Sequence, residues 1–238
     1  MKFSRNIYTY LNGKQFSNAL VVSLHGENSN ARDRLDFIEK LATGRRILHV
    51  GFTDHLPLIR EKAKSRRWLH GILLERAAYC AGIDIDGEAI EYCKTDIGIE
   101  NIYRHDVIND DPLPVIAENQ WDIAILAEVL EHIGNPVEFL LSLRKKYGHC
   151  IAKIVITVPN AWDIVNFLQA CRGIEFINSD HRFWFTPYTL AKVGDDAGFD
   201  LIETYLVGTS VKNWMLRQLP LRYPMLRQSL IAVFEPRQ

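Results

Sequence analysis

An apolar run passes directly into an acidic, histidine-bearing segment in the stretch Trp121-Asp-Ile-Ala-Ile-Leu-Ala-Glu-Val-Leu-Glu-His-Ile-Gly-Asn-Pro136. Residues 123–127 are apolar without interruption, which is typical of a strand that is covered on both faces. The polar cluster begins at Glu128, with no turn residue between. Ligands of open α/β sheets bind at the carboxyl ends of the strands. The stretch therefore predicts an α/β fold with a functional site directly after residue 127.

Three side chains of this segment have the spacing of a shared helix face. If residues 128–133 form one helical turn, Glu128, Glu131 and His132 stand at positions i, i+3 and i+4 and project together. They would then converge as proton carriers or metal ligands. The alternative is an ordinary solvated first turn, whose acidic residues complement the helix dipole. The spacing alone gives both interpretations equal weight.

The composition is that of a folded globular domain. The chain has 238 residues, of which 47% are hydrophobic and 24% are charged, so we expect one sizeable α/β domain. The formal net charge of -1 provides no general attraction to nucleic acid or to an anionic membrane, which argues against a nucleic-acid partner. No segment approaches the roughly 18 apolar residues of a membrane span. The first ten residues lack the apolar core of a signal peptide, so we expect a cytoplasmic protein without a transmembrane segment.

The cysteines do not suggest a metal or disulfide framework, because they are widely spaced and form no CxxC pair. They are Cys80, Cys93, Cys150 and Cys171. We interpret them as core residues or unreactive thiols.

Apolar runs and helical spacing alternate along the chain. The pattern predicts strands at residues 47–50, 81–85, 102–105, 123–126, 154–158, 201–205 and 229–234. It predicts helices over residues 68–78, 87–97, 136–147 and 162–171, and another that begins after Thr186. An earlier helix, capped by Asn28 or Ser29, ends at Gly44. Five strands with helical crossovers predict a parallel, doubly wound sheet with helices on both faces.

The organisation predicted from the sequence has two parts. Residues 1–44 form an N-terminal arm and one helix, and residues 45–238 form the main domain. An inserted segment at about residues 208–228 mixes large apolar and basic residues. It is a lid over a pocket, a helical hairpin packed on the sheet, or a patch that contacts a membrane surface. Its two prolines argue against one long helix. We favour a segment that packs on the sheet or covers a pocket as a lid.

Three successive strand ends carry a glycine and two acids. Gly51 follows the first strand, in a loop that lacks the further glycines of a dinucleotide fold. Asp84 ends the second strand, where its two carboxylate oxygens can accept hydrogen bonds from both hydroxyls of a ribose. Asp106 follows the third strand and can meet the amino group of an adenine that packs against Ile85 or Val107. Each acid alone is usually a helix cap, but the succession predicts a nucleoside site.

With these three strand ends the chain resembles the class I S-adenosylmethionine-dependent methyltransferases, whose Rossmann-like seven-stranded sheet has an antiparallel last strand. The resemblance covers residues 45–207 and the strand at 229–234. It departs from the family at His49, where an acid is usual, and at Thr53 and His55, where further glycines are usual. The loop is similar to that of a bacterial subgroup that acts on small molecules and glycans. The resemblance implies S-adenosylmethionine as cofactor, bound by Gly51, Phe52, Asp84, Ile85, Asp106, Val107 and Ala127.

A second resemblance concerns a metal. The segment Glu128-Val-Leu-Glu131-His132, together with Asp180-His181-Arg-Phe-Trp-Phe-Thr186, resembles an arrangement in small-RNA 2'-O-methyltransferases and some quinone-biosynthesis O-methyltransferases. The resemblance implies that Glu128, Glu131, His132 and His181 hold Mg²⁺ or Mn²⁺ beside the methyl acceptor. The alternative is a methyltransferase without a metal, in which His132 orients the substrate or acts as a base.

We expect transfer of a methyl group to an oxygen, in preference to a nitrogen, of a small molecule or a sugar or glycan precursor. His132 is the first candidate for a catalytic base and His181 the second. One alternative is an RNA 2'-O-methyltransferase with a divalent metal. Another is a non-catalytic scaffold with a degenerate cofactor loop, which His49, Thr53 and His55 suggest. A nicotinamide oxidoreductase ranks third, because the glycine fingerprint is absent.

Overall fold

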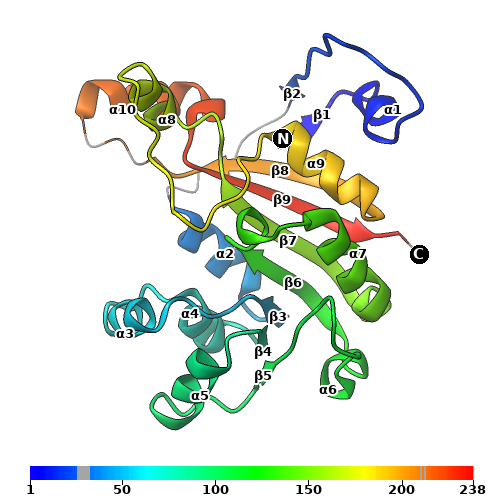
Figure 1. Ribbon diagram of the computed structural model, residues 1–238, viewed down its shortest axis with the longest axis vertical. Helices are drawn as coiled ribbons and strands as arrows, with labels where there is room; N and C mark the ends of the chain where they lie inside the picture. Colours follow the sequence, from blue (N-terminus) through cyan, green and yellow to red (C-terminus); the bar gives the residue numbers. More distant parts are fainter. Residues whose placement is uncertain (26–32, 210, 212, 238) are drawn as a thin grey trace.

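A seven-stranded sheet forms the centre of the protein in a computed structural model that describes residues 1–25, 33–209, 211 and 213–237 (Figure 1). The strand order is β5-β4-β3-β6-β7-β9-β8. The first five strands in this order are parallel, and β9 runs antiparallel to both of its neighbours. The strands are β3 (Arg46–Val50), β4 (Tyr79–Asp84), β5 (Ile102–Arg104), β6 (Trp121–Ala127), β7 (Ile151–Pro159), β8 (Phe199–Val207) and β9 (Ser229–Pro236). This arrangement confirms the predicted doubly wound sheet with an antiparallel last strand.

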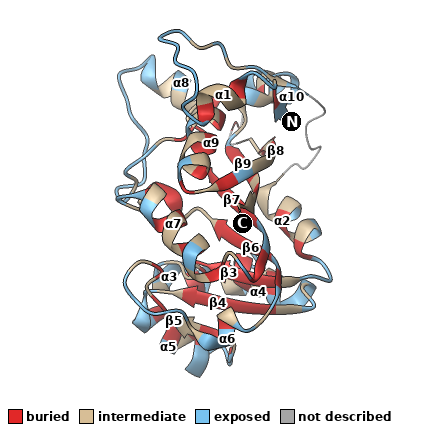
Figure 2. Cartoon of the chain, turned by 90° about the vertical axis from the view of Figure 1, so that its right-hand side faces the viewer, coloured by how far each residue is buried: buried red, intermediate tan, exposed pale blue. Residues whose placement is uncertain are grey.

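Helices cover both faces of the sheet, as predicted. The helices that follow the N-terminal arm are α2 (Arg34–Ala42), α3 (Leu56–Lys64), α4 (Leu69–Arg76), α5 (Gly87–Thr95), α6 (Pro114–Ala117), α7 (Pro136–Tyr147), α8 (Ile164–Ala170), α9 (Pro187–Asp196) and α10 (Trp214–Arg222). Ala124 and Leu126 of β6 share a core cluster with residues of α6, α7 and α9, whereas Ile123 and Ile125 pack with residues of α2 and α4. Because neighbouring side chains of a strand point to opposite faces, the apolar run of β6 serves both layers. Figure 2 shows the strands largely buried between them.

Helix α7 shows how local sequence sets an element boundary. The Asn135 side chain accepts a hydrogen bond from the backbone N–H of Glu138 at 3.2 Å, and Pro136 occupies the first helical position. A proline there loses no hydrogen bond, because the first N–H groups of a helix have no partner within it. The predicted bounds of this helix, 136–147, are confirmed.

The predicted helical turn at residues 128–133 is wrong. Only Leu130–His132 are helical, as one short 3₁₀ turn called η1. Glu128 has a φ of 59°, which is left-handed backbone that a helix cannot include. Its backbone N–H still donates to the Thr157 carbonyl oxygen of β7 at 2.9 Å, so sheet pairing continues past the apolar run. Glu128 therefore shares no helix face with Glu131 and His132.

The N-terminal part of the chain contains the expected arm and helix, but the helix begins later than predicted. Helix α2 begins after Asp33, whose side chain accepts from the Leu35 N–H at 2.8 Å. The predicted caps, Asn28 and Ser29, lie outside the described residues. In the N-terminal arm, β1 (Lys2–Phe3) pairs with β2 (Leu24–His25), and α1 (Ile7–Leu11) packs against α9. A chain division at residue 44 is still a proposal.

The segment after β8 folds as two short helical pieces, α10 and η2 (Pro224–Leu226). Pro220 lies inside α10 and Pro224 opens η2, consistent with the expectation that no long helix forms here. Among the described residues, no helix is long and apolar enough to cross a bilayer.

Candidate functional site

A cavity of about 690 Å³ opens at the carboxyl ends of β3 and β6. This volume is within the range of small-molecule sites. Segments far apart in the sequence line it, including Arg34, Gly51, Ala127, Glu128, His132, Asn178, His181, Gly208 and Gln228. One cavity thus connects the predicted cofactor turn with both predicted catalytic histidines.

The turn after β3 requires its glycine. Gly51 has a φ of 69°, and its N–H donates to the Ile83 carbonyl oxygen of β4 at 2.9 Å. A Cβ at this position would lie 2.5 Å from Cγ2 of Val129, so any larger residue meets both strain and a clash. The next residue, Phe52, is buried at 2% exposure. Because the space beside Gly51 is filled by Val129, the turn after β3 and the turn after β6 are in direct contact.

Asp84 is held in place at the edge of this turn. Its Oδ2 accepts a hydrogen bond from the Thr53 N–H at 2.9 Å, and its Oδ1 accepts one from the Asp86 N–H at 3.1 Å. Since each carboxylate oxygen has two lone pairs, both can accept a further hydrogen bond from a ribose hydroxyl. Ile85 is 66% exposed and presents an apolar surface beside the carboxylate. These positions suit a nucleoside, although neither residue lines the cavity described above.

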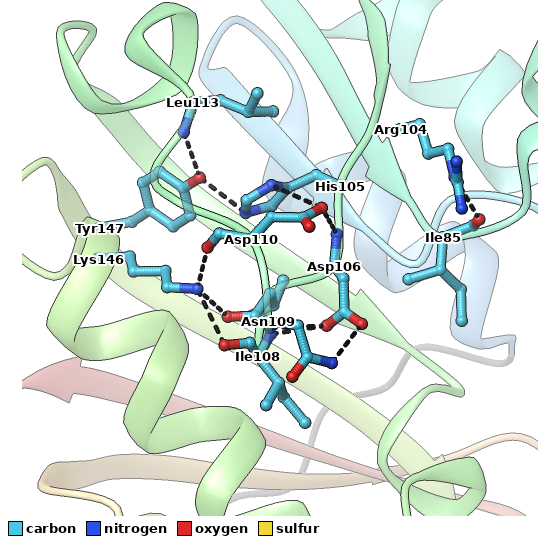
Figure 3. Close-up of polar contacts among 11 residues, drawn as sticks. Ile85, Arg104, His105, Asp106, Ile108, Asn109, Asp110, Leu113, Lys146 and Tyr147 are labelled. Carbon is cyan, nitrogen blue, oxygen red and sulfur yellow. Dashed lines mark hydrogen bonds and ion pairs between the residues drawn. The ribbon is translucent and has the colours of Figure 1, made fainter.

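Asp106 organises its own loop (Figure 3). Its Oδ1 accepts from the N–H groups of Ile108 and Asn109, at 2.8 and 3.2 Å, and its Oδ2 accepts from the Asn109 side chain at 2.8 Å. These hydrogen bonds, that of the Asn109 side chain above all, lower the pKa of Asp106. Val107 is 3% exposed, so its side chain belongs to the core. A contact of either residue with adenine is still a prediction.

The last turn of α7 anchors the same loop (Figure 3). The Lys146 ammonium donates to the carbonyl oxygens of Val107 and Ile108, at 2.8 and 3.1 Å. The Tyr147 hydroxyl accepts from the Leu113 N–H at 2.9 Å and lies 2.9 Å from Nε2 of the buried His105. This contact joins the two side chains by one hydrogen bond. No local pattern in the sequence indicated this network, because it joins α7 to the end of β5.

A buried histidine pair lies behind the cofactor turn. His49 and His70 are 2% and 0% exposed, and their Nδ1 atoms lie 3.2 Å apart. Burial lowers the pKa of His70 to about 3. Burial, and then the neighbouring His70, lower the pKa of His49 well below 6.5. Both rings are therefore neutral at pH 7, with one Nδ1 donating to the other.

This pair predicts that acid destabilises the fold. Below about pH 6.5 the unfolded chain binds protons at both imidazoles and the folded chain does not, so stability falls as the pH decreases toward the depressed pKa values. The loss is at most about 1.4 kcal/mol per pH unit for each histidine. Urea unfolding at pH 7 and pH 5 should show a smaller loss for His70→Gln than for the wild type. The exposed His25→Gln is the matched control and should leave the loss unchanged; equal losses in all three proteins would contradict the assignment.

Glu131 is a buried carboxyl group without a partner. It is 0% exposed, and neither oxygen has a hydrogen-bond partner among the described residues. Burial, and then the charge of Glu128, raise the pKa of Glu131 to about 9. Because an unpaired buried carboxylate is costly, Glu131 holds a proton at neutral pH unless a cation compensates its charge.

Two histidines complete a possible ligand set around Glu131. One ligand atom each of Glu131, His132 and His181 lie within 4.8 Å of one another. The two rings meet edge to face, with centroids 4.6 Å apart, and the buried Nδ1 of His181 has no hydrogen-bond partner in the described part of the chain. Burial, and then His132, lower the pKa of His181, which keeps its imidazole neutral and able to bind a metal. The orphaned atoms and the mixed oxygen and nitrogen donors fit a divalent cation.

Glu128 lies beside this set and outside it. Its Oε1 accepts from the Thr157 hydroxyl at 3.0 Å and lies 3.7 Å from Nε of Arg34. The structure thus brings together three of the four predicted ligands. Sequence reasoning did not find Arg34, because α2 is about a hundred residues from the acidic segment.

The loop that carries His181 is bound to η1. The Arg182 N–H donates to the Glu131 carbonyl oxygen at 2.7 Å, and its guanidinium donates to the His132 carbonyl oxygen. Asp180 also lies 3.4 Å from Nε2 of His55, which joins this loop to the one after β3. The sequence paired the two histidine segments by resemblance, but it did not reveal Arg182 as the link between them.

Comparison with known proteins agrees with this geometry. A family model described as "Methyltransferase domain" matches residues 24–204. A ubiquinone biosynthesis O-methyltransferase of Psychrobacter arcticus is 25% identical over 178 residues, which are 66% of this chain and 67% of that protein. A small RNA 2'-O-methyltransferase of Tetrahymena thermophila is 24% identical over 186 residues, or 69% of this chain and 41% of that protein.

Solved structures show the same fold. The small RNA methyltransferase HEN1 superposes with a TM-score of 0.55 and 17% identity, covering 92% of this chain and 28% of that one. At this identity the likeness concerns the fold alone. Such folds hold their ligands at the carboxyl ends of the strands, which is where the cavity lies.

Proposed function

Because the chain belongs to the methyltransferase-domain family and is an S-adenosylmethionine-dependent methyltransferase, we propose that it methylates an oxygen atom of a small molecule. The observation that carries this proposal is the single cavity that joins Gly51 and Ala127 to His132 and His181. A cofactor at the first pair and an acceptor at the second would meet within it. Family membership argues against the scaffold and oxidoreductase alternatives.

The residues of the cofactor turn would position the methyl donor. When bound, S-adenosylmethionine supplies a methyl group already activated by its sulfonium. Asp84 would accept the ribose hydroxyls, Gly51 would let the backbone approach the methionine part, and Ile85 would pack on the adenine. Alignment of the acceptor with the methyl group would then account for much of the rate.

The histidines would prepare the acceptor. His181 is neutral, because burial lowers its pKa, and its Nδ1 has no partner among the described residues. In a site without a metal it can therefore take a proton from an acceptor hydroxyl, as can His132, which lines the same cavity. Loss of that proton makes the oxygen a better nucleophile.

Glu131, His132 and His181 would hold a divalent cation, which lowers the pKa of a hydroxyl bound to it. Two imidazoles and one carboxylate favour Mn²⁺ over Mg²⁺, because Mg²⁺ prefers oxygen ligands. Glu128 as a fourth ligand stays a prediction. Its carboxylate would have to leave Thr157 and Arg34 to reach the ion.

A small molecule is the acceptor class that we favour over RNA. This chain matches 67% of the ubiquinone-biosynthesis relative but 41% of the small-RNA relative. The net charge of -1 also provides little attraction to a phosphate backbone. Since a metal binds two adjacent oxygens well, an acceptor with vicinal hydroxyls, such as a catechol, fits the proposed site best.

Calorimetry tests the proposal first. We expect S-adenosylmethionine and S-adenosylhomocysteine to bind with micromolar affinity and NADH not to bind. Methyl transfer to a panel of catechols, measured with and without Mn²⁺, then tests the acceptor class. Cofactor binding without transfer to any catechol would overturn the acceptor class alone, whereas absence of cofactor binding would overturn the whole assignment.

A further inference from the structure

Helix α10 and the turn after it expose an unusual amount of apolar surface. We call this the α10 surface and define it by its exposed side chains. They are Trp214 (72% exposed), Met215 (60%), Leu216 (37%), Leu221 (55%), Tyr223 (51%) and Met225 (37%). Within α10, Pro220 is the one residue that is buried. An apolar patch of this kind on a folded protein marks an interaction site.

The charge of this segment has one sign. Between Glu203 and Glu235 the sequence has no acidic residue and four basic ones, Lys212, Arg217, Arg222 and Arg227. Arg227 stabilises the segment from within, by donating to the carbonyl oxygens of Pro220 at 3.0 Å and Leu206 at 2.8 Å. Arg217 and Arg222 are exposed, and neither forms an ion pair with a described residue, although Arg222 lies over the Tyr223 ring, 5.8 Å from its centroid. Both guanidinium groups are therefore available to an anionic partner.

We propose that the α10 surface docks on the surface of an anionic lipid bilayer. Exposed Trp, Met and Leu side chains insert into the boundary between headgroups and acyl chains, and adjacent arginines bind lipid phosphates. Single-stranded RNA suits this surface less well. Its bases stack on aromatic rings, whereas Met215, Leu216 and Leu221 are aliphatic. Two exposed arginines also provide few of the contacts that a phosphate backbone needs.

The two ends of this segment reach the candidate active site. Gly208 and Thr209 precede α10, Gln228 and Ser229 follow η2, and all four residues line the cavity. Docking would therefore place the rim of the cavity next to the bilayer. This position suits an acceptor with a polar head for methylation and an apolar tail that stays in the membrane. The acceptor class rests on the function proposed above, but the docking does not.

A second exposed segment lies at the same end of the molecule. Trp162, Phe167 and Phe176, in and around α8, are 54%, 63% and 73% exposed. Figures 1 and 2 both place α8 and α10 at one end of the fold. The Asn160 side chain donates to the carbonyl oxygens of Met225 and Arg227, at 2.8 and 2.7 Å, and so fixes one segment to the other. A second group of exposed apolar side chains thus lies at the same end of the fold as the α10 surface.

Vesicle cosedimentation of the full chain tests the docking. We expect binding to phosphatidylcholine vesicles that contain phosphatidylglycerol, and at least tenfold weaker binding to phosphatidylcholine alone. The double variant Met215→Ser/Leu221→Ser should bind anionic vesicles at least tenfold more weakly. Arg217→Gln/Arg222→Gln should lose the preference for anionic lipid and the dependence on salt. The matched control is Leu74→Ser/Val115→Ser, with exposed apolar residues on α4 and α6, and should bind as the wild type does.

Three results would overturn the proposal. They are no sedimentation with anionic vesicles, equal loss of binding in the control variant, and tight binding of a single-stranded RNA that Met215→Ser/Leu221→Ser abolishes. Thermal unfolding confirms that each variant is folded. Calorimetry with S-adenosylhomocysteine on the same variants separates this test from that of the methyltransferase site, because a failure to dock would leave cofactor binding unchanged.

Discussion

Replacement of Glu131 by glutamine is expected to lower kcat by about 100-fold or more, in line with the loss of a group that holds a catalytic metal. Glutamine keeps the shape of the side chain but cannot carry the negative charge that a divalent cation requires. The Glu131 carboxyl group is fully buried, and its oxygens have no hydrogen-bond partner among the described residues, so the substitution breaks no hydrogen bond of this side chain to a described residue. The response of activity to added Mn²⁺ should disappear together with kcat. Affinity for S-adenosylhomocysteine should change little.

Glu128→Gln is the matched control for this variant. It makes the same chemical change at a carboxylate that is bound to Thr157 and lies beside Arg34. We expect a much smaller decrease in kcat than for Glu131→Gln, and retention of the Mn²⁺ response; loss of that response would instead support Glu128 as the fourth ligand. Full activity of Glu131→Gln, with or without Mn²⁺, would show that the buried carboxyl group is structural.

Replacement of Asp84 by alanine is expected to weaken cofactor binding by about 100-fold. Two hydrogen bonds to a charged acceptor, each contributing at least about 1.5 kcal/mol, account for this factor. The substitution also removes the acceptor of the Thr53 N–H, which holds the turn after β3. Calorimetry with S-adenosylhomocysteine measures the effect directly.

Two control variants show whether a loss of affinity in Asp84→Ala is specific to the ribose contact. Asp86→Ala removes the cap of α5, whose side chain accepts from the Ala89 N–H at 3.0 Å, and should lower stability by about 1 kcal/mol while affinity is kept. His132→Ala should also keep cofactor affinity and reduce turnover. If Asp84→Ala bound the cofactor as tightly as the wild type, the ribose would lie elsewhere.

Local sequence was sufficient to predict most of the fold. Unbroken apolar runs located the strands, because burial on both faces leaves few other solutions. The pair Asn135-Pro136 located the start of α7 for equally local reasons. The turn after β6 could not be predicted in this way. Its left-handed residue, Glu128, pairs with Thr157 of a neighbouring strand, and helical spacing says nothing about that partner.

In the candidate site, too, some residues could be predicted from the sequence and others could not. Asp84 was predictable as a strand-end carboxylate, and His132 and His181 by resemblance. Arg34 and Arg182 were not, since each acts on the acidic segment from a distant part of the chain. Asp106 shows the opposite case, because a strand-end acid with the expected position forms its hydrogen bonds within its own loop.

The contact between Gly51 and Val129 would couple the proposed cofactor and acceptor parts of the site. Val129 lies between Glu128 and Leu130 in the chain, and its Cγ2 occupies the space that a side chain at Gly51 would need. A ligand that moved one of these turns toward the other would act on this contact. Binding of the cofactor and binding of the acceptor would then be thermodynamically linked. The factor by which the cofactor changes the affinity for the acceptor must equal the factor by which the acceptor changes the affinity for the cofactor. A cofactor that favoured acceptor binding would then itself be held more tightly once the acceptor is in place.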